Sequence, residues 1–214
     1  MLKIWGRKTS INVQKVMWAT AELGLAHERI DAGGPFGKTD TPEFAAMNPN
    51  RLVPVIDDKG FVLWESNACI RYLANTYGLG TMAPLSPEDR ARADQWMEWS
   101  IATLYNDLIP GLYVQFVRVT AADRSAALIE ANARKTGERL AIVDAQLAGR
   151  NFLIGKELTM ADIAFGALLY RYYTMPITRP SLPNVEAYYQ RLSARKAYQQ
   201  HVMLDWQGLK IPGA

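Results

Sequence analysis

The sequence predicts two structural units, an α/β unit over residues 1–78 and an all-α unit over residues 87–214, joined by a linker at 79–86. Two observations predict this division. Before residue 78, short runs rich in β-branched and aromatic residues alternate with helical patterns. After the linker, strand signals disappear and helical stretches follow one another. The 49% hydrophobic content of the 214 residues is typical of a globular protein with a substantial core.

The elements of the first unit are expected in the order β-α-β-α-β-β-α. They are a strand at 2–5, a helix at 11–24, a strand at 27–30, a helix at 41–48, a strand around Val55, a strand at 61–64 and a helix that ends near Tyr77. The first β-α-β segment implies a parallel pair, because a crossover helix joins its strands. Only the polar step Asp-Asp-Lys-Gly at 57–60 separates the last two strands, so they should form an antiparallel hairpin. The result is a four-stranded mixed sheet with helices on its faces, which is a thioredoxin-like topology.

The second unit opens with a strong helix start. Residues 86–89, Ser-Pro-Glu-Asp, combine a hydroxyl cap, a proline at the first helical position and two acids in the first turn. This predicts a helix from residue 87 that runs until Pro110. We expect a second helix at about 121–148, which stops at Gly149. A third helix should begin with a capping box between Thr159 and Asp162, and more helix should follow Pro183.

Charge and composition exclude several classes of function. The 24 basic and 21 acidic residues leave a net charge of +3 and are scattered along the chain, so nucleic acid is not an expected partner. The first ten residues lack the apolar run of a signal peptide or anchor, and the longest apolar run, 163–170, is far below the roughly 20 residues that span a bilayer. The single cysteine, Cys69, cannot form an internal disulfide or a thiol-rich metal site. We expect a cytoplasmic protein with no membrane partner and no metal.

Pro54 interrupts the third strand between two valines, where it removes a backbone donor from the ladder. At the start of this strand in a thioredoxin-like sheet, an X-Pro step is commonly cis, which turns the backbone N–H and C=O of Val53 toward the cleft. Those groups can bind an extended peptide in the manner of an added strand. The alternative is a trans proline on an edge strand that binds nothing.

A second feature is the Glu65-Ser66 step, where the fourth strand yields to a helix. Ser66 can cap this helix, and free N–H groups there favour a negatively charged group. Glu65 can pair with an ammonium. One corner thus suits a carboxylate and an amine together, as in the α-amino-acid end of a γ-glutamyl peptide; in the alternative interpretation Ser66 is only a helix cap.

The Val-Pro step at 53–54 followed by Glu-Ser at 65–66 resembles the glutathione-binding pattern of the cytosolic glutathione transferases, in particular their Ser-type members. The resemblance extends over the whole chain, since GKELTMADIAF in the second half is similar to a segment of the family's helical domain. It implies a homodimer that binds glutathione in the thioredoxin-like half and a small electrophile against the helical half.

Glutathione's thiol must be held as thiolate, because a cysteine-like pKa near 8.5 leaves only a few per cent ionised at neutral pH. The family uses a Tyr, Ser or Cys donor at the end of the first strand. No tyrosine precedes Tyr72 and no cysteine precedes Cys69, which leaves the segment RKTSINVQKV. Alignment with Ser-type transferases through Lys15-Val16 puts Ser10 at the catalytic serine, Asn12 at a second donor found in some bacterial members, and Thr9 at the site if the register shifts by one. In the alternative interpretation, Ser10 or Asn12 only caps the helix.

The resemblance also implies a basic or amide group for the glycine carboxylate of glutathione, and Lys38 and Arg51 compete for this role. The leading hypothesis is a glutathione transferase that moves alkyl or aryl groups to sulfur, a detoxification reaction. The alternatives are a glutathione-dependent disulfide reductase or peroxidase on the same scaffold, and a non-catalytic binding module.

Overall fold

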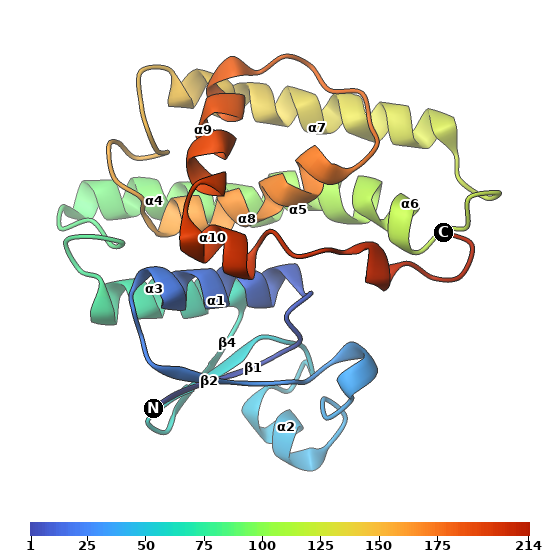
Figure 1. Ribbon diagram of the computed structural model, residues 1–214. Helices are drawn as coiled ribbons and strands as arrows, with labels where there is room; N and C mark the ends of the chain where they lie inside the picture. Colours follow the sequence, from blue (N-terminus) through green and yellow to red (C-terminus); the bar gives the residue numbers. More distant parts are fainter.

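The computed structural model describes residues 1–214, and its first unit has the predicted order of elements (Figure 1). These elements are β1 (Leu2–Trp5), α1 (Ile11–Glu22), β2 (His27–Ile30), α2 (Pro42–Met47), β3 (Val55–Asp58), β4 (Phe61–Trp64) and α3 (Ser66–Tyr77). The four strands form one sheet in the order β2-β1-β3-β4. Strand β1 is parallel to β2 and antiparallel to β3, and β3 is antiparallel to β4. The predicted thioredoxin-like mixed sheet is confirmed.

The sheet is covered differently on its two faces. Helices α1 and α3 lie between the sheet and the second unit, and α2 lies on the other side (Figure 1). A compact apolar cluster fills the space between the sheet and the two helices; its buried members are Leu2, Ile4, Val13, Val16, Met17, Ile56, Cys69 and Leu73. Cys69 is therefore a core residue of this unit.

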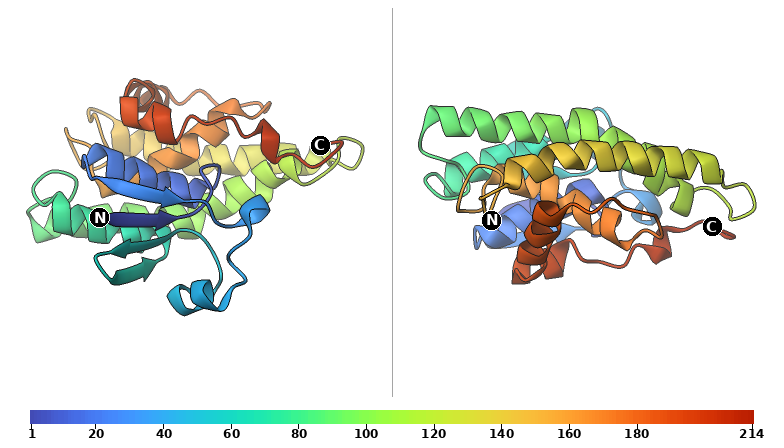
Figure 2. Two further views of the ribbon diagram at one scale, coloured as in Figure 1. Left: turned by 60° about the horizontal axis from the view of Figure 1, so that its bottom comes forward. Right: turned by 90° about the horizontal axis from the view of Figure 1, so that it is seen from above.

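The second unit is entirely helical. Its elements are α4 (Pro87–Trp99), a π turn (Ser100–Leu104), α5 (Tyr105–Leu108), a second π turn (Ile109–Tyr113), α6 (Val114–Val117), α7 (Ala126–Leu147), α8 (Met160–Thr174), α9 (Pro183–Ser193) and α10 (Lys196–His201). The run from α4 to α6 and helix α7 extend side by side (Figure 2). No helix combines the length and the apolar character needed to cross a membrane.

The prediction that the first helix of this unit ends at Pro110 is wrong, because helical backbone continues to Val117. A proline lacks the N–H for an α-helical bond, and its ring clashes with a carbonyl one turn back. A π turn, which is a wider form of helix, covers Ile109–Tyr113 and accommodates the proline. Helix α7 also begins later than expected, at Ala126, where the Ser125 hydroxyl accepts from the Leu128 N–H at 3.2 Å.

Helix α8 forms the centre of the second unit, and twelve of its fifteen residues are buried. The predicted capping box between Thr159 and Asp162 is present at its start. The buried Asp162 carboxylate accepts from the Thr159 N–H at 2.8 Å, from the Leu153 N–H at 2.9 Å and from the Tyr188 hydroxyl at 3.0 Å. The carboxylate thus fixes the loop before α8 and ties it to α9.

The two units meet through α1 and α3, and Arg71 of α3 forms ion pairs with Asp94 and Glu98 of α4. The Trp18 ring packs edge-on against Tyr198 with centroids 4.8 Å apart, and it lies against Gly166 of α8. A Cβ at Gly166 would sit 2.6 Å from Leu192 and 3.1 Å from this ring, so the glycine allows the close approach without a shift of either side chain. One turn after Trp18, at the end of α1, Glu22 receives two hydrogen bonds from Arg195, at 2.8 and 2.7 Å.

Candidate functional site

The peptide bond between Val53 and Pro54 is cis, as the sequence predicts. Pro54 is buried, Val53 is half-buried, and both precede the first residue of β3, Val55. Val53 also lies under the loop after β2, because a Cβ at Gly33 would be 3.4 Å from its side chain. The Val-Pro step therefore lies next to the turn that follows β2, one of the two edge strands of the sheet.

The β4–α3 corner differs from the prediction in one respect. Helix α3 begins with Ser66, and Glu65 takes the N-cap position with a φ of +67°, so Ser66 is not the cap. A left-handed conformation is uncommon for glutamate, and here it turns the chain sharply from strand to helix. As a result the Glu65 side chain is exposed at the corner, while the Ser66 hydroxyl is buried and points back into the unit.

Ser66 joins this corner to the start of α1. Its hydroxyl donates to the Asn12 side-chain oxygen at 3.3 Å, across 54 residues of sequence. Because that oxygen of Asn12 is occupied, the side-chain amide N–H groups of Asn12 are turned away from Ser66. The two segments singled out in the sequence thus meet at one place.

Ser10 occupies the N-cap position of α1, with extended backbone, but its hydroxyl makes no capping hydrogen bond. The turn before it is held by two backbone contacts. The Ser10 N–H donates to the Arg7 carbonyl at 3.1 Å, and the Arg171 guanidinium of α8 donates to the Thr9 carbonyl at 3.2 Å. Ser10 and Asn12 are both half-buried, so each keeps part of its surface open to a ligand.

The two basic residues considered for a carboxylate differ in their surroundings. Arg51 donates to the Asp40 carbonyl at 3.5 Å and lies 3.9 Å from the Asp40 carboxylate. Lys38 is exposed, has a φ of +68°, and takes part in none of the side-chain hydrogen bonds or ion pairs of the chain. Of the two, Lys38 is the cation without a partner inside the protein.

Lys15 was missed as a site residue by the sequence analysis. It lies three residues after Asn12, hence on the same face of α1, and it is fully buried. Its ammonium has no hydrogen-bond partner and sits 5.8 Å from the centre of the Tyr105 ring. Burial lowers the pKa of Lys15 to about 8, and the nearby Glu65 charge acts in the opposite direction. A lysine inside the apolar run INVQKVMWA was the signal that could have revealed this buried charge.

Burial shifts the pKa of Cys69 in the opposite direction from that of Lys15. Its thiol donates to the Leu63 carbonyl at 3.6 Å in the core, and burial, with the Glu65 charge, raises its pKa to about 12. A thiol with this pKa stays protonated at physiological pH and is a poor nucleophile.

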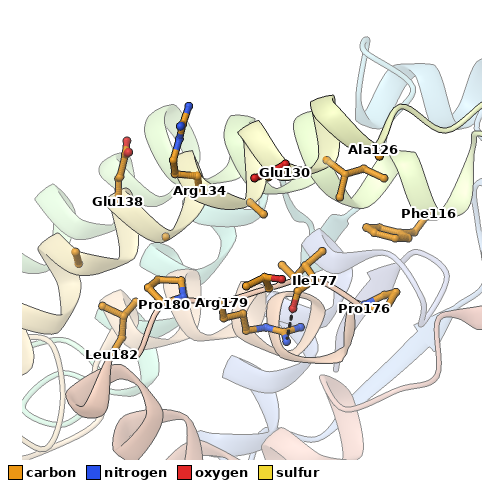
Figure 3. Close-up of a pocket in the computed structure, with 15 residues that line it drawn as sticks. Phe116, Ala126, Glu130, Arg134, Glu138, Pro176, Ile177, Arg179, Pro180 and Leu182 are labelled. Carbon is orange, nitrogen blue, oxygen red and sulfur yellow. Dashed lines mark hydrogen bonds between the residues drawn. The ribbon is translucent and has the colours of Figure 1, made fainter.

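A cavity of about 820 Å³ lies elsewhere, between α7 and the segment 176–182 (Figure 3). Glu130, Arg134 and Glu138 line it from α7, and Arg179 lines it from the opposite segment. Arg179 is itself bound to the carbonyls of Tyr172 and Ile177, at 2.7 and 3.1 Å. None of the site residues predicted from the sequence lines this cavity.

Comparison with known proteins identifies the family. Two family models match the chain, the glutathione S-transferase N-terminal domain over residues 9–76 and the glutathione S-transferase C-terminal domain over residues 94–196. The chain belongs to the glutathione S-transferase family. The predictions of a cytosolic-type glutathione transferase, of its fold and of glutathione as co-substrate are confirmed.

The matches to individual relatives extend over almost the full length of this chain. Glutathione S-transferase GstB of Escherichia coli is 38% identical over 95% of this chain and 99% of the relative, and glutathione S-transferase 3 of Zea mays is 31% identical over 94% and 93%. Among solved structures, the theta class glutathione S-transferase of Xanthomonas axonopodis pv. citri with glutathione bound has a TM-score of 0.89 and 43% identity. It covers 95% of this chain and 98% of its own.

The buried Lys15 predicts a specific pH dependence of stability. Its pKa is about 8 in the folded chain and 10.5 without perturbation, so between these values the unfolded state binds more protons. The free energy of unfolding should therefore rise with pH over this window. Lys15→Met removes this contribution, so the wild type should gain about 2–3 kcal/mol relative to the variant between pH 7 and 10.

Urea unfolding of both proteins at pH 7, 8.5 and 10 measures this difference. Tyrosines with raised pKa values are common to both proteins and cancel in the comparison. Parallel pH profiles for wild type and Lys15→Met would show that Lys15 titrates normally.

Proposed function

We propose that the corner between the β1–α1 turn and the β4–α3 turn binds glutathione, and that Ser10 and Asn12 stabilise its thiolate for attack on a small electrophile. The observation that carries this proposal is the Ser66–Asn12 hydrogen bond at 3.3 Å. It unites the segment expected to hold the sulfur with the segment expected to hold the γ-glutamyl end. The theta class structure with 43% identity is described with glutathione bound, which supports the same ligand here.

Ser10 and Asn12 have free donors in the right place. The Ser10 hydroxyl is not used as a helix cap, and the Asn12 oxygen is occupied by Ser66, so a hydroxyl and an amide N–H can both donate to a sulfur anion. The N-terminus of α1 adds a favourable dipole for negative charge. Thr9 is less suited, since its carbonyl is bound by Arg171 and its side chain precedes the helix.

The other contacts in the proposed site can be assigned to the separate parts of glutathione. Val53, before Pro54, offers its backbone N–H and C=O to the cysteinyl residue of glutathione. The exposed Glu65 pairs with the γ-glutamyl ammonium, and the N–H groups at the start of α3, including that of Ser66, receive the adjacent carboxylate. The unpaired Lys38 serves the glycine carboxylate.

A reductase or peroxidase reaction needs the same thiolate. With Cys69 buried and its pKa near 12, such a reaction would have to use two glutathione molecules in succession. Nothing in the site favours this reaction over conjugation. A non-catalytic binding module would not need free donors at Ser10 and Asn12.

We also propose a homodimer in the cytoplasm. The first unit exposes Phe61 and Val62 on β4 and Leu52 before β3, which gives apolar surface for a second copy. The free, buried Cys69 agrees with a reducing compartment. Cell fractionation that places the chain outside the cytoplasm would contradict the location.

The dimer predicts a mass in solution of twice 24.0 kDa. Phe61→Glu should shift this mass toward the monomer, because a charge would be buried in the contact. Leu128→Glu, at an exposed apolar position on α7, is the matched control and should leave the mass unchanged. Light scattering at micromolar concentration measures all three proteins, and a stable wild-type monomer would remove the proposal.

Glu65→Gln should weaken glutathione binding by roughly 1.5–3 kcal/mol, because an ionic hydrogen bond to the ammonium is lost. Glu28→Gln, an exposed glutamate on β2, makes the same change of net charge away from the corner. Calorimetric titration with glutathione measures both variants. An unchanged affinity of the Glu65 variant would show that another group holds the ammonium.

Ser10→Ala should raise the pKa of enzyme-bound glutathione, with each unit equal to about 1.4 kcal/mol of lost preference for the anion. Conjugation should fall most at pH 6–7 and approach the wild-type rate at pH 9, where the thiol ionises without help. Asn12→Ala should behave similarly, and the double variant should be worse than either. Ultraviolet titration of the thiolate decides the point. Superimposable titration curves, with stability lower by about 1 kcal/mol, would assign Ser10 to helix capping alone.

A further inference from the structure

Three arginines from distant parts of the chain converge on Tyr113, which lies at the end of the second π turn. Arg7 belongs to the β1–α1 turn, Arg118 follows α6, and Arg171 lies on α8. The Arg171 guanidinium is 5.7 Å from the centre of the Tyr113 ring. Burial raises the pKa of the Tyr113 phenol, and all three guanidinium charges act in the opposite direction. This arginine cluster therefore spans the junction of the two units.

The positive charge of the arginine cluster has no counter-ion in the protein. None of the three arginines forms one of the chain's ion pairs with a carboxylate. Arg171 is 1% exposed, and one of its terminal nitrogens has no hydrogen-bond partner, as is true of the Tyr113 hydroxyl. Burial lowers the pKa of Arg7, and the like charge of Arg118 lowers it further. Uncompensated buried charge is costly, so an anion in this region would be stabilised.

The arginine cluster adjoins the candidate sulfur site. The Arg7 carbonyl accepts from the Ser10 N–H, and Arg171 holds the carbonyl of Thr9. The Arg7 side chain runs over two glycines after β2, since a Cβ at Gly34 would be 3.3 Å from it. Arg7 therefore lies over the loop after β2, beside the place where the thiolate would lie, and its charge acts on Tyr113 of the helical unit.

The accessibility of the three arginines differs. Arg118 is exposed and donates to the Leu209 carbonyl at 3.3 Å, and Arg7 is half-buried. Arg171 and Tyr113 lie behind them, with the Trp206 ring packed edge-on against Tyr113 at 5.2 Å. A ligand entering the cleft can touch Arg7 and Arg118, whereas Arg171 and Tyr113 act through them as positioning residues.

We propose that Arg7 and Arg118 form an anion-binding site on the electrophile side of the cleft, and that the preferred electrophiles carry a carboxylate. This inference rests on the proposed function and specifies its second substrate. In the reaction with a chloroarene carboxylate, the glutathione sulfur forms a bond to the ring carbon, the C–Cl bond breaks, and chloride leaves with the electron pair. The carboxylate is unchanged and only orients the ring.

The test compares 4-chloro-3,5-dinitrobenzoate with the corresponding benzamide, which differ by one charge. Each enzymatic kcat/KM is divided by the rate constant for free glutathione at the same pH, which removes the difference in intrinsic reactivity. The wild type should prefer the acid. Arg118→Gln should lower the normalised kcat/KM of the acid about three- to tenfold, and Arg7→Gln about tenfold, with the amide changed less than about twofold. Arg92→Gln removes an exposed arginine on α4 that is paired with Asp89, and it should change neither substrate.

The outcomes separate this inference from the proposed function. A wild type that conjugates the amide but does not prefer the acid overturns the anion site and leaves the transferase intact. If Arg118→Gln lowers the normalised kcat/KM of the acid and of the amide equally, Arg118 has only a structural role and the anion site is also overturned. A raised KM for glutathione with an unchanged acid-to-amide ratio would assign the arginines to glutathione's own glycine carboxylate. If neither substrate reacts faster than with free glutathione, the proposed function itself fails.

Discussion

The packing of α1 between the sheet and the helical unit is the constraint on which the rest of the structure depends. Every residue from Val13 to Thr20 is buried, so both faces of this helix are committed to contacts. One face packs on the sheet and α3, and the other carries Trp18 into the groove that Gly166 leaves open. Because the helix cannot shift, its first turn holds Ser10 and Asn12 in fixed positions.

The same packing explains why a charge is trapped at Lys15. The helix needs apolar residues around its whole circumference, and Lys15 interrupts that pattern without a carboxylate bonded to its ammonium. The negative charge of Glu65, at the start of the neighbouring helix, offsets part of the effect of burial on the Lys15 pKa. A stable core alone would favour a methionine there, so packing does not account for this buried charge next to the proposed glutathione site.

The order of strands and helices could be predicted because it depends on local patterns, such as the short polar turn at 57–60 and the capping residues before α4 and α8. The cis Val53–Pro54 bond was likewise indicated by one proline in one place. Two local details were missed for physical reasons. Glu65 adopts a left-handed conformation that its residue type does not indicate, and the π turns around Pro110 keep a helix going where proline normally ends it.

The arginine cluster could not be predicted, because Arg7, Arg118 and Arg171 come from three elements and share no sequence pattern. The net charge of +3 describes only the whole chain and does not reveal the local excess of positive charge around Tyr113. The two halves of the cleft differ in this respect. In the proposed site, the glutathione half combines side chains of the two turns with backbone groups and helix starts that the topology of the family fixes. The proposed electrophile half depends on Arg7 of the β1–α1 turn and on Arg118 after α6, side chains that can vary while the fold is kept. Membership of the family therefore identifies the first substrate, and only the side chains at the domain junction can identify the second.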